Sequence, residues 1–245
     1  MRSRGDEWLW RPSARDAAGA PLVCFPHAGA SAAAFREWYE ALAPGFEVWA
    51  ALLPGRGARM AEPPARSTAE LAGPIARAIA GQFEEPVTLF GHSFGGLLAF
   101  DVAHELVALG RAPRQVFVSA TRAPSRIERT RVHALDEAGL RQWLVALGGV
   151  PDELLADPYL LDLILPVVRA DTEACELYPA ELATPLPAPI TALVGTEDEF
   201  ATVADVECWA DYTTEAFHLA PIKGGHMFLT DDPAAVWDVV RGETA

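Results

Sequence analysis

The sequence predicts one α/β domain, in which a mostly parallel sheet is flanked by helices and interrupted by a long helical insertion. The chain has 245 residues, a length typical of one α/β domain. Its hydrophobic fraction of 51% is enough to form a substantial core. Short apolar runs alternate along the chain with helical patterns, as expected for parallel strands joined by helices.

The apolar runs and helical patterns give the expected elements in order. The expected strands are residues 22–25, 47–53, 87–90, 115–119, 190–194 and 216–219, with a possible edge strand at 7–10. The expected helices are residues 32–43, 68–83, 95–109, 203–212 and 233–240. Pro233 follows two aspartates, which suits the first turn of the last helix.

The insertion, residues 124–186, contains helical patterns and no strand pattern. Helices are expected there at 137–147, 151–155 and 158–177. An insertion of about 60 residues between two strands is usually a subdomain or a lid. We therefore expect residues 1–245 to form one domain with a helical insertion. Most of its apolar side chains, such as Trp143 and Leu147, are expected to pack against the core, and a minority to line a channel.

Composition excludes several classes of protein. The formal charge is −15, from 19 basic and 34 acidic residues, and this argues against nucleic-acid binding. No apolar stretch is long enough to span a membrane, and the first residues lack a signal-peptide pattern, so a cytoplasmic protein is expected. Cys24, Cys175 and Cys208 are far apart, which predicts reduced, buried thiols with neither a disulfide nor a metal site.

The strongest chemical motif is Gly91-His-Ser93-Phe-Gly95, which has the pattern G-x-S-x-G. It follows an apolar strand and opens a helical pattern, the context of the nucleophile elbow of α/β-hydrolases. The glycines permit a tight turn, so that the hydroxyl of Ser93 stands clear at the carboxyl edge of the sheet. The alternative is an ordinary glycine-rich turn with an inert serine.

A serine nucleophile needs a base, and in α/β-hydrolases an acid and then a histidine follow the serine along the chain. His226 lies on a glycine loop after the last expected strand, where it can reach the elbow. The other candidates are weaker by position: His92 within the elbow, His104 in a helix, His133 before the insertion helices and His218 in a strand.

The acid is expected just after the strand at 190–194. Asp198 in Gly195-Thr-Glu-Asp198 is preferred, because this spacing places its carboxylate immediately past the turn. Glu197 and Glu199 remain alternatives, and are otherwise solvated neighbours. The acid would accept the Nδ1–H of His226 and so leave Nε2 free to act as a base.

Acyl transfer also requires two N–H donors for the tetrahedral oxyanion. The first expected donor is the backbone N–H of Phe94, directly after the nucleophile. The second comes from the loop after the early strand, where the Ala28 N–H is the best candidate. His27 either lines the site, shapes this loop or only caps the turn.

Five motifs together resemble the type II thioesterases, the discrete editing enzymes associated with polyketide synthases and non-ribosomal peptide synthetases. They are F-P-H-A-G-A-S, L-P-G-R-G-A-R at 53–59, G-H-S-F-G-G, G-T-E-D and G-G-H-M-F-L. The resemblance runs from about Trp8 to Val240. It implies an acyl substrate linked as a thioester to the phosphopantetheine arm of an acyl or peptidyl carrier domain, and a helical lid. One departure is Glu199, where many relatives have proline.

The expected activity is a serine thioesterase that clears stalled or mis-primed acyl groups through an acyl-enzyme, without metal or organic cofactor. A carboxylesterase or lipase acting on a small free ester is the nearest alternative, since fold and triad are shared. A chain-terminating domain cut from a synthase is a second, disfavoured by an initiator-like Met1. A non-catalytic hydrolase-like binding protein is a third.

The residues expected to contact the carrier lie in the most basic short stretch, Arg122 to Arg131. It holds four arginines and one acid, Glu128. Arg122, Arg126 and Arg129 are the candidates, because guanidinium groups bind phosphates and carboxylates bidentately. The stretch follows the strand after the elbow helix, which places it at the sheet edge of Ser93. The alternative is a solvated linker that contacts nothing.

Overall fold

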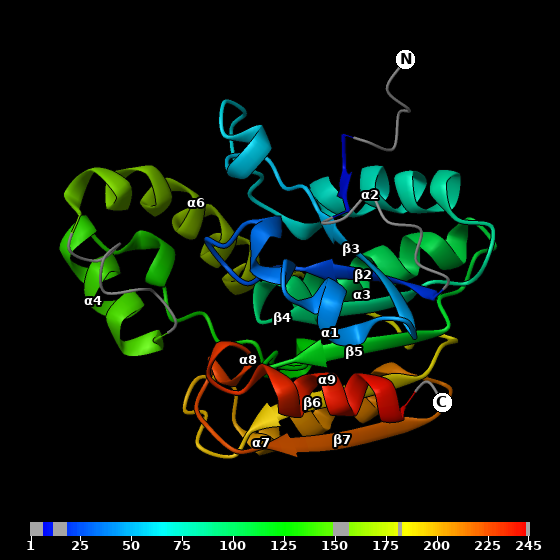
Figure 1. Cartoon of the computed structure of the whole chain (residues 1–245). Helices are drawn as coiled ribbons and strands as arrows, with labels where there is room; N and C mark the ends of the chain where they lie inside the picture. The colour runs from blue at the N-terminus through cyan, green and yellow to red at the C-terminus, as the bar shows by residue number, and fades with distance from the viewer. Residues whose placement is uncertain (1–6, 12–18, 149–156, 181–182, 244–245) are drawn as a thin grey trace.

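The computed structural model describes residues 7–11, 19–148, 157–180 and 183–243. Seven strands form one sheet in the order β1-β3-β2-β4-β5-β6-β7 (Figure 1). Only β1 is antiparallel to its neighbour; the other pairs are parallel. The strands are β1 Leu9–Trp10, β2 Ala20–Phe25, β3 Phe46–Ala51, β4 Thr88–His92, β5 Gln115–Ser119, β6 Ile190–Gly195 and β7 Phe217–Ile222.

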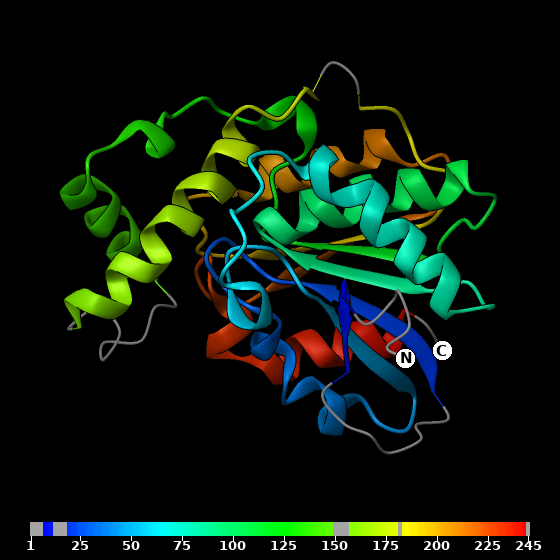
Figure 2. The same ribbon diagram turned by 90° about the horizontal axis from the view of Figure 1, so that it is seen from above.

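Helices cover both faces of the sheet (Figure 2). One face carries α2 Thr68–Gln82, α3 Phe94–Ala108 and α7 Val203–Glu207, followed by the 3₁₀ helix η6 Cys208–Tyr212. The other carries the 3₁₀ helix η1 Ala32–Phe35, α1 Trp38–Leu42, α8 Phe228–Asp231 and α9 Pro233–Gly242. A hydrophobic cluster lies on each side, so the sheet is buried on both faces, as its nearly continuous apolar strands require.

Two helices expected to be continuous are instead divided. The segment 32–43 splits into η1 and α1, and 203–212 splits into α7 and η6. In each case two large aromatic side chains three residues apart enter the core: Phe35 with Trp38, and Trp209 with Tyr212. Trp209 and Tyr212 lie within η6, whose three residues per turn bring them to the same side. Phe35 ends η1 and Trp38 begins α1, so the chain is redirected between them. Core packing therefore overrides the helical pattern at these places.

In the described part of the insertion between β5 and β6, the regular elements are helices joined by short irregular segments. It contains the 3₁₀ helices η3 Pro124–Arg126 and η4 Val132–Ala134 and the longer helices α4 Glu137–Leu147 and α6 Pro158–Glu176. The helix expected at 151–155 lies outside the described residues. Figure 1 shows α4 and α6 beyond the arrowheads of the strands, so the insertion stands at the carboxyl edge of the sheet. Within the described residues, no helix is long and apolar enough to cross a membrane.

The expectation of three buried thiols is correct only for Cys24. Cys24 is fully buried in β2, and burial raises the pKa of its thiol well above the usual value. Cys175 and Cys208 are partly exposed. Cys175 borders the cavity described below, and the Sγ of Cys208 lies 3.1 Å from the Arg126 guanidinium at the surface. Cys175 lies on α6 of the insertion, and Cys208 contacts Arg126, which is also in the insertion. The spacing of cysteines along the sequence does not predict how the insertion packs.

Candidate active site

Ser93 lies at the sharp turn between β4 and α3. Its backbone has φ 55° and ψ −119°, a conformation rare for a residue with a side chain. A Cβ at Gly91 would lie 2.0 Å from the carbonyl oxygen of Gly95, and one at Gly95 would lie 2.2 Å from that of Phe25. Only glycine fits at these two positions. The strained turn is therefore built by the two glycines of the motif.

Hydrogen bonds from the neighbouring strand hold this turn. The Ser93 N–H donates to the Ser119 carbonyl at 2.8 Å. The single proton of the Thr121 hydroxyl is shared between the Ser93 carbonyl at 3.0 Å and the Ser119 carbonyl at 2.8 Å. These bonds fix the backbone of Ser93 on both sides, so its side chain has a defined direction.

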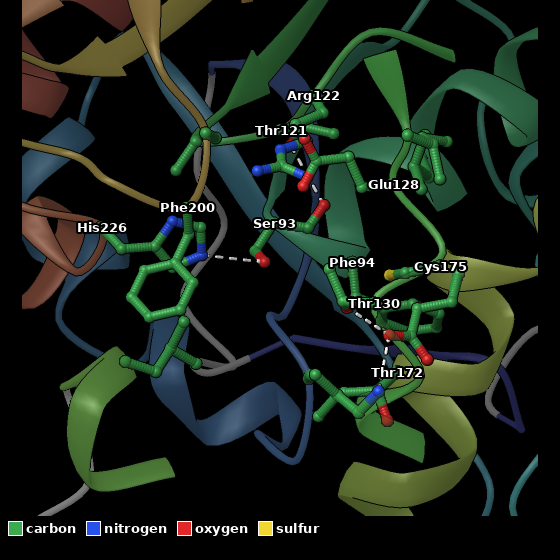
Figure 3. A pocket seen from close by; sticks show the side chains of 18 of the residues that line it. Ser93, Phe94, Thr121, Arg122, Glu128, Thr130, Thr172, Cys175, Phe200 and His226 are labelled. Carbon is green, nitrogen blue, oxygen red and sulfur yellow. Dashed lines mark hydrogen bonds and ion pairs between the residues drawn. The ribbon is translucent and has the colours of Figure 1, made fainter. Parts of the chain in front are cut away.

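The structure brings Ser93, His226 and Asp198 together. His226 Nε2 lies 3.0 Å from Ser93 Oγ (Figure 3). His226 Nδ1 lies 2.8 Å from Asp198 Oδ2. His226 and Asp198 are 7% and 6% exposed, so their interaction is shielded from water. Because a carboxylate only accepts, Nδ1 carries the hydrogen towards Asp198, and neutral Nε2 can accept the proton of Ser93.

The carboxylate of Asp198 is fully used. Its Oδ1 accepts the N–H groups of Phe200 and Ala201 at 2.8 and 2.9 Å, while Oδ2 accepts from His226. Glu197 and Glu199 are exposed. Asp198 is therefore the acid that faces His226, because the turn after β6 directs its side chain inward and leaves its two neighbours at the surface.

His92 supports the site in a way that the sequence did not reveal. Its ring is fully buried, with Nδ1 2.9 Å from Ser119 Oγ and Nε2 3.0 Å from the His226 carbonyl. Burial, together with the neighbouring His226 and His27, holds the pKa of His92 well below its usual value. The neutral ring donates Nε2–H to the His226 carbonyl, because a carbonyl only accepts, and takes the Ser119 hydroxyl at Nδ1. The one feature of the sequence that could have indicated this role is that His92 directly precedes the nucleophile.

The remaining histidines lie away from Ser93. His104 is on α3, His133 pairs with Glu176, and His218 pairs with Glu243 near the end of the chain. None of the three is among the residues that line the cavity at Ser93.

Two backbone N–H groups are available near Ser93. The Phe94 N–H lies at the start of α3, where helical N–H groups have no partner within the helix and the helix dipole favours negative charge. Ala28 borders the same cavity. The His27 carbonyl accepts the Ala30 N–H at 3.1 Å, so the Ala28 N–H of the same trans peptide points away from this turn. No described residue accepts a hydrogen bond from that N–H.

His27 shapes this region without lining the cavity. Its ring packs edge-on against His92 with ring centres 6.0 Å apart. Burial, and then the nearby His226 and Arg56, lower its pKa to about 4. His27 is therefore neutral near pH 7.

A cavity of about 340 Å³ opens at Ser93 and His226. Its walls are mainly apolar, with contributions from the core and from the insertion. The core side includes Phe94, Leu97, Ala120 and Phe200, and the insertion side includes Ile127, Val132, Trp143 and Leu147. The volume lies near the lower end of the range for small-molecule sites.

A few polar groups lie in the part of the cavity formed by α6 and by the segment around Thr130 that precedes α4 (Figure 3). Glu176 accepts the Thr130 hydroxyl, the Val132 and His133 N–H groups and His133 Nδ1. Burial alone would raise its pKa, but these hydrogen bonds hold it below the usual value. Glu176 therefore ties the chain entering the insertion to α6, and its acceptor positions are taken.

Aromatic rings connect the insertion to the histidine. Trp143 of α4 and Phe200 are edge-to-face with centres 6.4 Å apart, and Phe200 packs against His226 at 5.6 Å. The Phe200 ring lies beside His226 at the cavity (Figure 3). Helix α4 of the insertion is thus connected to His226 through the ring of Phe200.

The arginines of this stretch differ in exposure and in ion pairing. Arg122 borders the cavity, but its guanidinium pairs with Glu128 at 2.8 Å and with Asp205 at 3.6 Å. Arg126 and Arg129 are exposed. Glu128 is the one acid within the stretch, and a second acid, Asp205, reaches Arg122 from α7, far along the chain.

This sheet order, the strained serine turn and the Ser-His-Asp arrangement define an α/β-hydrolase. A family model described as a thioesterase domain matches residues 20–242. The probable cadicidin biosynthesis thioesterase of Streptomyces griseus is 38% identical over 94% of this chain, which spans 63% of that relative. Thioesterase PikA5 of Streptomyces venezuelae is 36% identical over 91% of this chain and 80% of its own.

A solved structure extends the comparison. The type II thioesterase BorB from the borrelidin biosynthetic cluster has a TM-score of 0.89 and 33% identity, over 97% of both chains. The chain therefore belongs to the thioesterase family, the hydrolases of thioesters.

Proposed function

We propose that the protein is a serine thioesterase of the type II class, which removes acyl groups from the phosphopantetheine arm of acyl or peptidyl carrier domains. The observation that carries the proposal is the Ser93–His226–Asp198 chain of hydrogen bonds at the mouth of an apolar cavity. Its biological role is to clear stalled or mis-primed acyl groups from polyketide or non-ribosomal peptide synthases in the cytoplasm.

In the first step, Ser93 Oγ attacks the carbonyl carbon of the thioester while His226 Nε2 takes the hydroxyl proton. The N–H groups of Phe94 and Ala28 stabilise the negative oxygen of the tetrahedral intermediate. The carbon–sulfur bond then breaks, and His226 returns the proton to the departing pantetheine sulfur. The acyl group remains as an ester on Ser93.

In the second step, water replaces the thiol. His226 removes a proton from the water as it attacks the ester, and gives that proton to Ser93 Oγ when the acyl bond breaks. Asp198 stabilises the imidazolium in both steps and keeps Nδ1 protonated. The products are a free carboxylic acid and the restored enzyme, and the residues present supply every proton transfer.

The insertion serves as a lid in this proposal. It supplies one wall of the cavity, and Trp143 and Leu147 would contact the acyl chain. The apolar walls favour alkyl chains, because burying each methylene contributes about 0.8 kcal/mol.

Arg126 and Arg129 are proposed to contact the carrier domain. Carrier domains of this kind are usually acidic, and this chain carries a charge of −15, so attraction must come from a local patch. Both side chains are exposed beside the cavity-lining Ile127 and Glu128. Arg122, which is already paired, would contribute only by exchanging its acidic partners.

Charge reversal tests the carrier contact. Replacing Arg126 and Arg129 with Glu should raise KM for acyl-carrier substrates roughly tenfold, the scale of one charge-assisted contact. Hydrolysis of a short acyl-pantetheine should change little. Arg77→Glu with Arg114→Glu is the matched control, because both residues are exposed, neither lines the cavity, and the change in charge is equal. Equal effects on carrier and carrier-free substrates would contradict the contact.

Substrate comparison separates thioesterase from esterase activity. The proposal predicts a higher kcat/KM for an acyl-carrier thioester than for a p-nitrophenyl ester of the same acyl group. A preference for the free ester would favour a carboxylesterase. No labelling by a serine-directed phosphonate would indicate a non-catalytic protein.

A further inference from the structure

A buried ion pair joins the insertion to the loop that carries Ala28. Arg56, which follows β3, donates from Nη1 to Asp171 Oδ2 at 2.6 Å and from Nη2 to Asp171 Oδ1 at 2.8 Å. Asp171 lies on α6, and the two side chains are 6% and 0% exposed. Such a bidentate pair between a guanidinium and a carboxylate has a fixed geometry.

The same carboxylate also binds the loop. Asp171 Oδ2 accepts the Gly29 N–H at 2.9 Å, and Arg56 Nη1 lies 3.4 Å from the Ala30 carbonyl. A second contact comes from the same helix: a Cβ at Gly29 would lie 2.7 Å from Val168 Cγ2. Helix α6 therefore fixes this loop through a hydrogen bond and through close packing.

The loop itself is a four-residue turn from His27 to Ala30. Gly29, its third residue, has φ +79°, the value of a type II turn, which requires glycine there. The type I and type II forms differ by a flip of the central peptide, here Ala28–Gly29. The Gly29 N–H belongs to that peptide, so its bond to Asp171 fixes the form and the place of the turn. The Ala28 N–H belongs to the preceding peptide and faces away from the turn because the His27 carbonyl accepts the Ala30 N–H.

We propose that Asp171 and Arg56 are positioning residues for the oxyanion hole: the ion pair anchors the turn at its Gly29 N–H and thereby holds the Ala28 N–H, on the preceding peptide, in place towards the substrate oxygen. The inference rests on the proposed function, in which Ala28 supplies the second donor. The geometry of the oxyanion hole then depends on how helix α6 packs against the loop that carries Ala28. The inference also gives a role to the arginine of the L-P-G-R-G motif.

Two neutral double variants isolate the hydrogen bond from the buried charge. Arg56→Met with Asp171→Asn leaves an amide oxygen that can accept the Gly29 N–H. Arg56→Met with Asp171→Leu removes that acceptor at similar side-chain volume. Neither variant leaves an unpaired buried charge. The variants are compared on a short acyl-pantetheine, with rates divided by the active fraction found by phosphonate titration.

The Leu-bearing variant should have a kcat about 10 to 100 times lower than the Asn-bearing one, because misplacing a catalytic donor by about 1 Å costs on that order. KM should change less than about twofold, and the pH profile, which reports His226, should not move. The affinity for a trifluoromethyl ketone, which forms an oxyanion on Ser93, should fall by the same factor as kcat/KM. Partial unfolding would lower the active fraction, for which the rates are corrected. It would not lower kcat and ketone affinity by the same factor while KM and the pH profile stay unchanged.

A third pair serves as a control for general damage to the insertion. Arg141 and Asp162 form an ion pair at 3.1 Å between α4 and α6, and neither lines the cavity. Arg141→Met with Asp162→Leu should leave kcat within about twofold. If the Leu-bearing variant does not fold, Arg56→Met with Asp171→Ala, which also lacks the acceptor and leaves no buried charge, must still lower kcat and ketone affinity together at constant KM relative to the Asn-bearing variant.

The outcomes separate the inference from the proposed function. Equal kcat and equal ketone affinity in the Asn- and Leu-bearing variants would overturn the inference while the wild type remains a thioesterase. A wild type that does not hydrolyse the acyl-pantetheine would overturn the proposed function, and the ketone affinities would still report on the loop.

Discussion

Ser93 is the residue on which the proposed chemistry depends. Its hydroxyl is the only nucleophile placed against His226 Nε2 within the described residues. Ser93→Ala and His226→Ala should each lower kcat by about 10⁶, since the two groups act as a unit. Hydrolysis of an acyl-pantetheine measures this, with Ser125→Ala on the exposed η3 turn as the control. A Ser93→Ala enzyme with a tenth of the wild-type rate would contradict the role of the elbow.

Asp198 should matter through the tautomer of His226. Asp198→Asn keeps the shape but presents a donor or a weaker acceptor to Nδ1, and should lower kcat by about 10⁴ with the fold intact. Glu197→Gln and Glu199→Gln are natural controls, because both side chains are exposed. A larger loss at either glutamate than at Asp198 would assign the acid to that residue instead.

His92 should contribute to stability. His92→Leu removes the partners of two buried groups, the His226 carbonyl and the Ser119 hydroxyl. The free energy of unfolding should fall by about 2–4 kcal/mol, which lowers Tm by roughly 4–16 °C. Thermal unfolding measures the effect, and His218→Leu at the surface should change the free energy by less than about 0.5 kcal/mol. Equal effects of the two substitutions would show that the buried hydrogen bonds contribute nothing.

At the scale of elements, helix α4 should set the preferred acyl length. Leu147 lines the cavity, whereas Val145 is 60% exposed on the same helix. Leu147→Trp should lower kcat/KM for long acyl chains by roughly tenfold or more, on the scale of rejecting a methylene, and spare acetyl groups. Val145→Trp should leave the length profile unchanged. Equal loss for all chain lengths would instead indicate unfolding of the insertion.

The sequence predicted the strands and most helices because their signals are local. The apolar runs and the glycine, proline and capping residues lie within each element, and helix α4 was predicted with its observed ends. The split at Phe35 and Trp38 could not be predicted, since it depends on which side chains enter the core. For the same reason the ion pair of Arg56 with Asp171, 115 residues apart, left no pattern in the sequence.

In the site, too, local motifs could be predicted from the sequence, whereas contacts between distant segments could not. Ser93, His226 and Asp198 could be selected because each lies in a short motif after a strand, and the structure brings them together. The partner of Arg122 on α7 and the contact of His92 with the His226 carbonyl join segments that only folding brings together. Motifs predict which groups react, whereas the groups that position them are found in the tertiary structure.

The whole molecule should lose stability in weak acid through His27, whose pKa is lowered by folding. The pKa of His27 is lowered to about 4 in the folded protein, against 6.5 for the exposed group. Between these values the unfolded chain binds a proton that the folded one does not, so the free energy of unfolding falls as pH falls. From pH 7 to pH 5 the loss should be about 1–2 kcal/mol for this residue.

Denaturant unfolding at several pH values tests this behaviour. His27→Gln removes the titrating group, so the free energy of unfolding should depend less steeply on pH between 7 and 5, whatever its absolute value. The Ser125→Ala protein, in which no titrating group is removed, should keep the wild-type slope. A His27→Gln protein with an unchanged slope would show that His27 does not carry the acid sensitivity.

The central claim is that Ser93 takes the acyl group from a carrier thioester. The direct measurement mixes the enzyme with an equal amount of acyl-loaded carrier domain, quenches within milliseconds to seconds, and records intact masses of both proteins. The account predicts that acyl mass leaves the carrier, appears on Ser93 in matching amount, and is then released as free acid, with no transfer to Ser93→Ala. A carrier that keeps its acyl group, while the same enzyme hydrolyses a p-nitrophenyl ester, would contradict it.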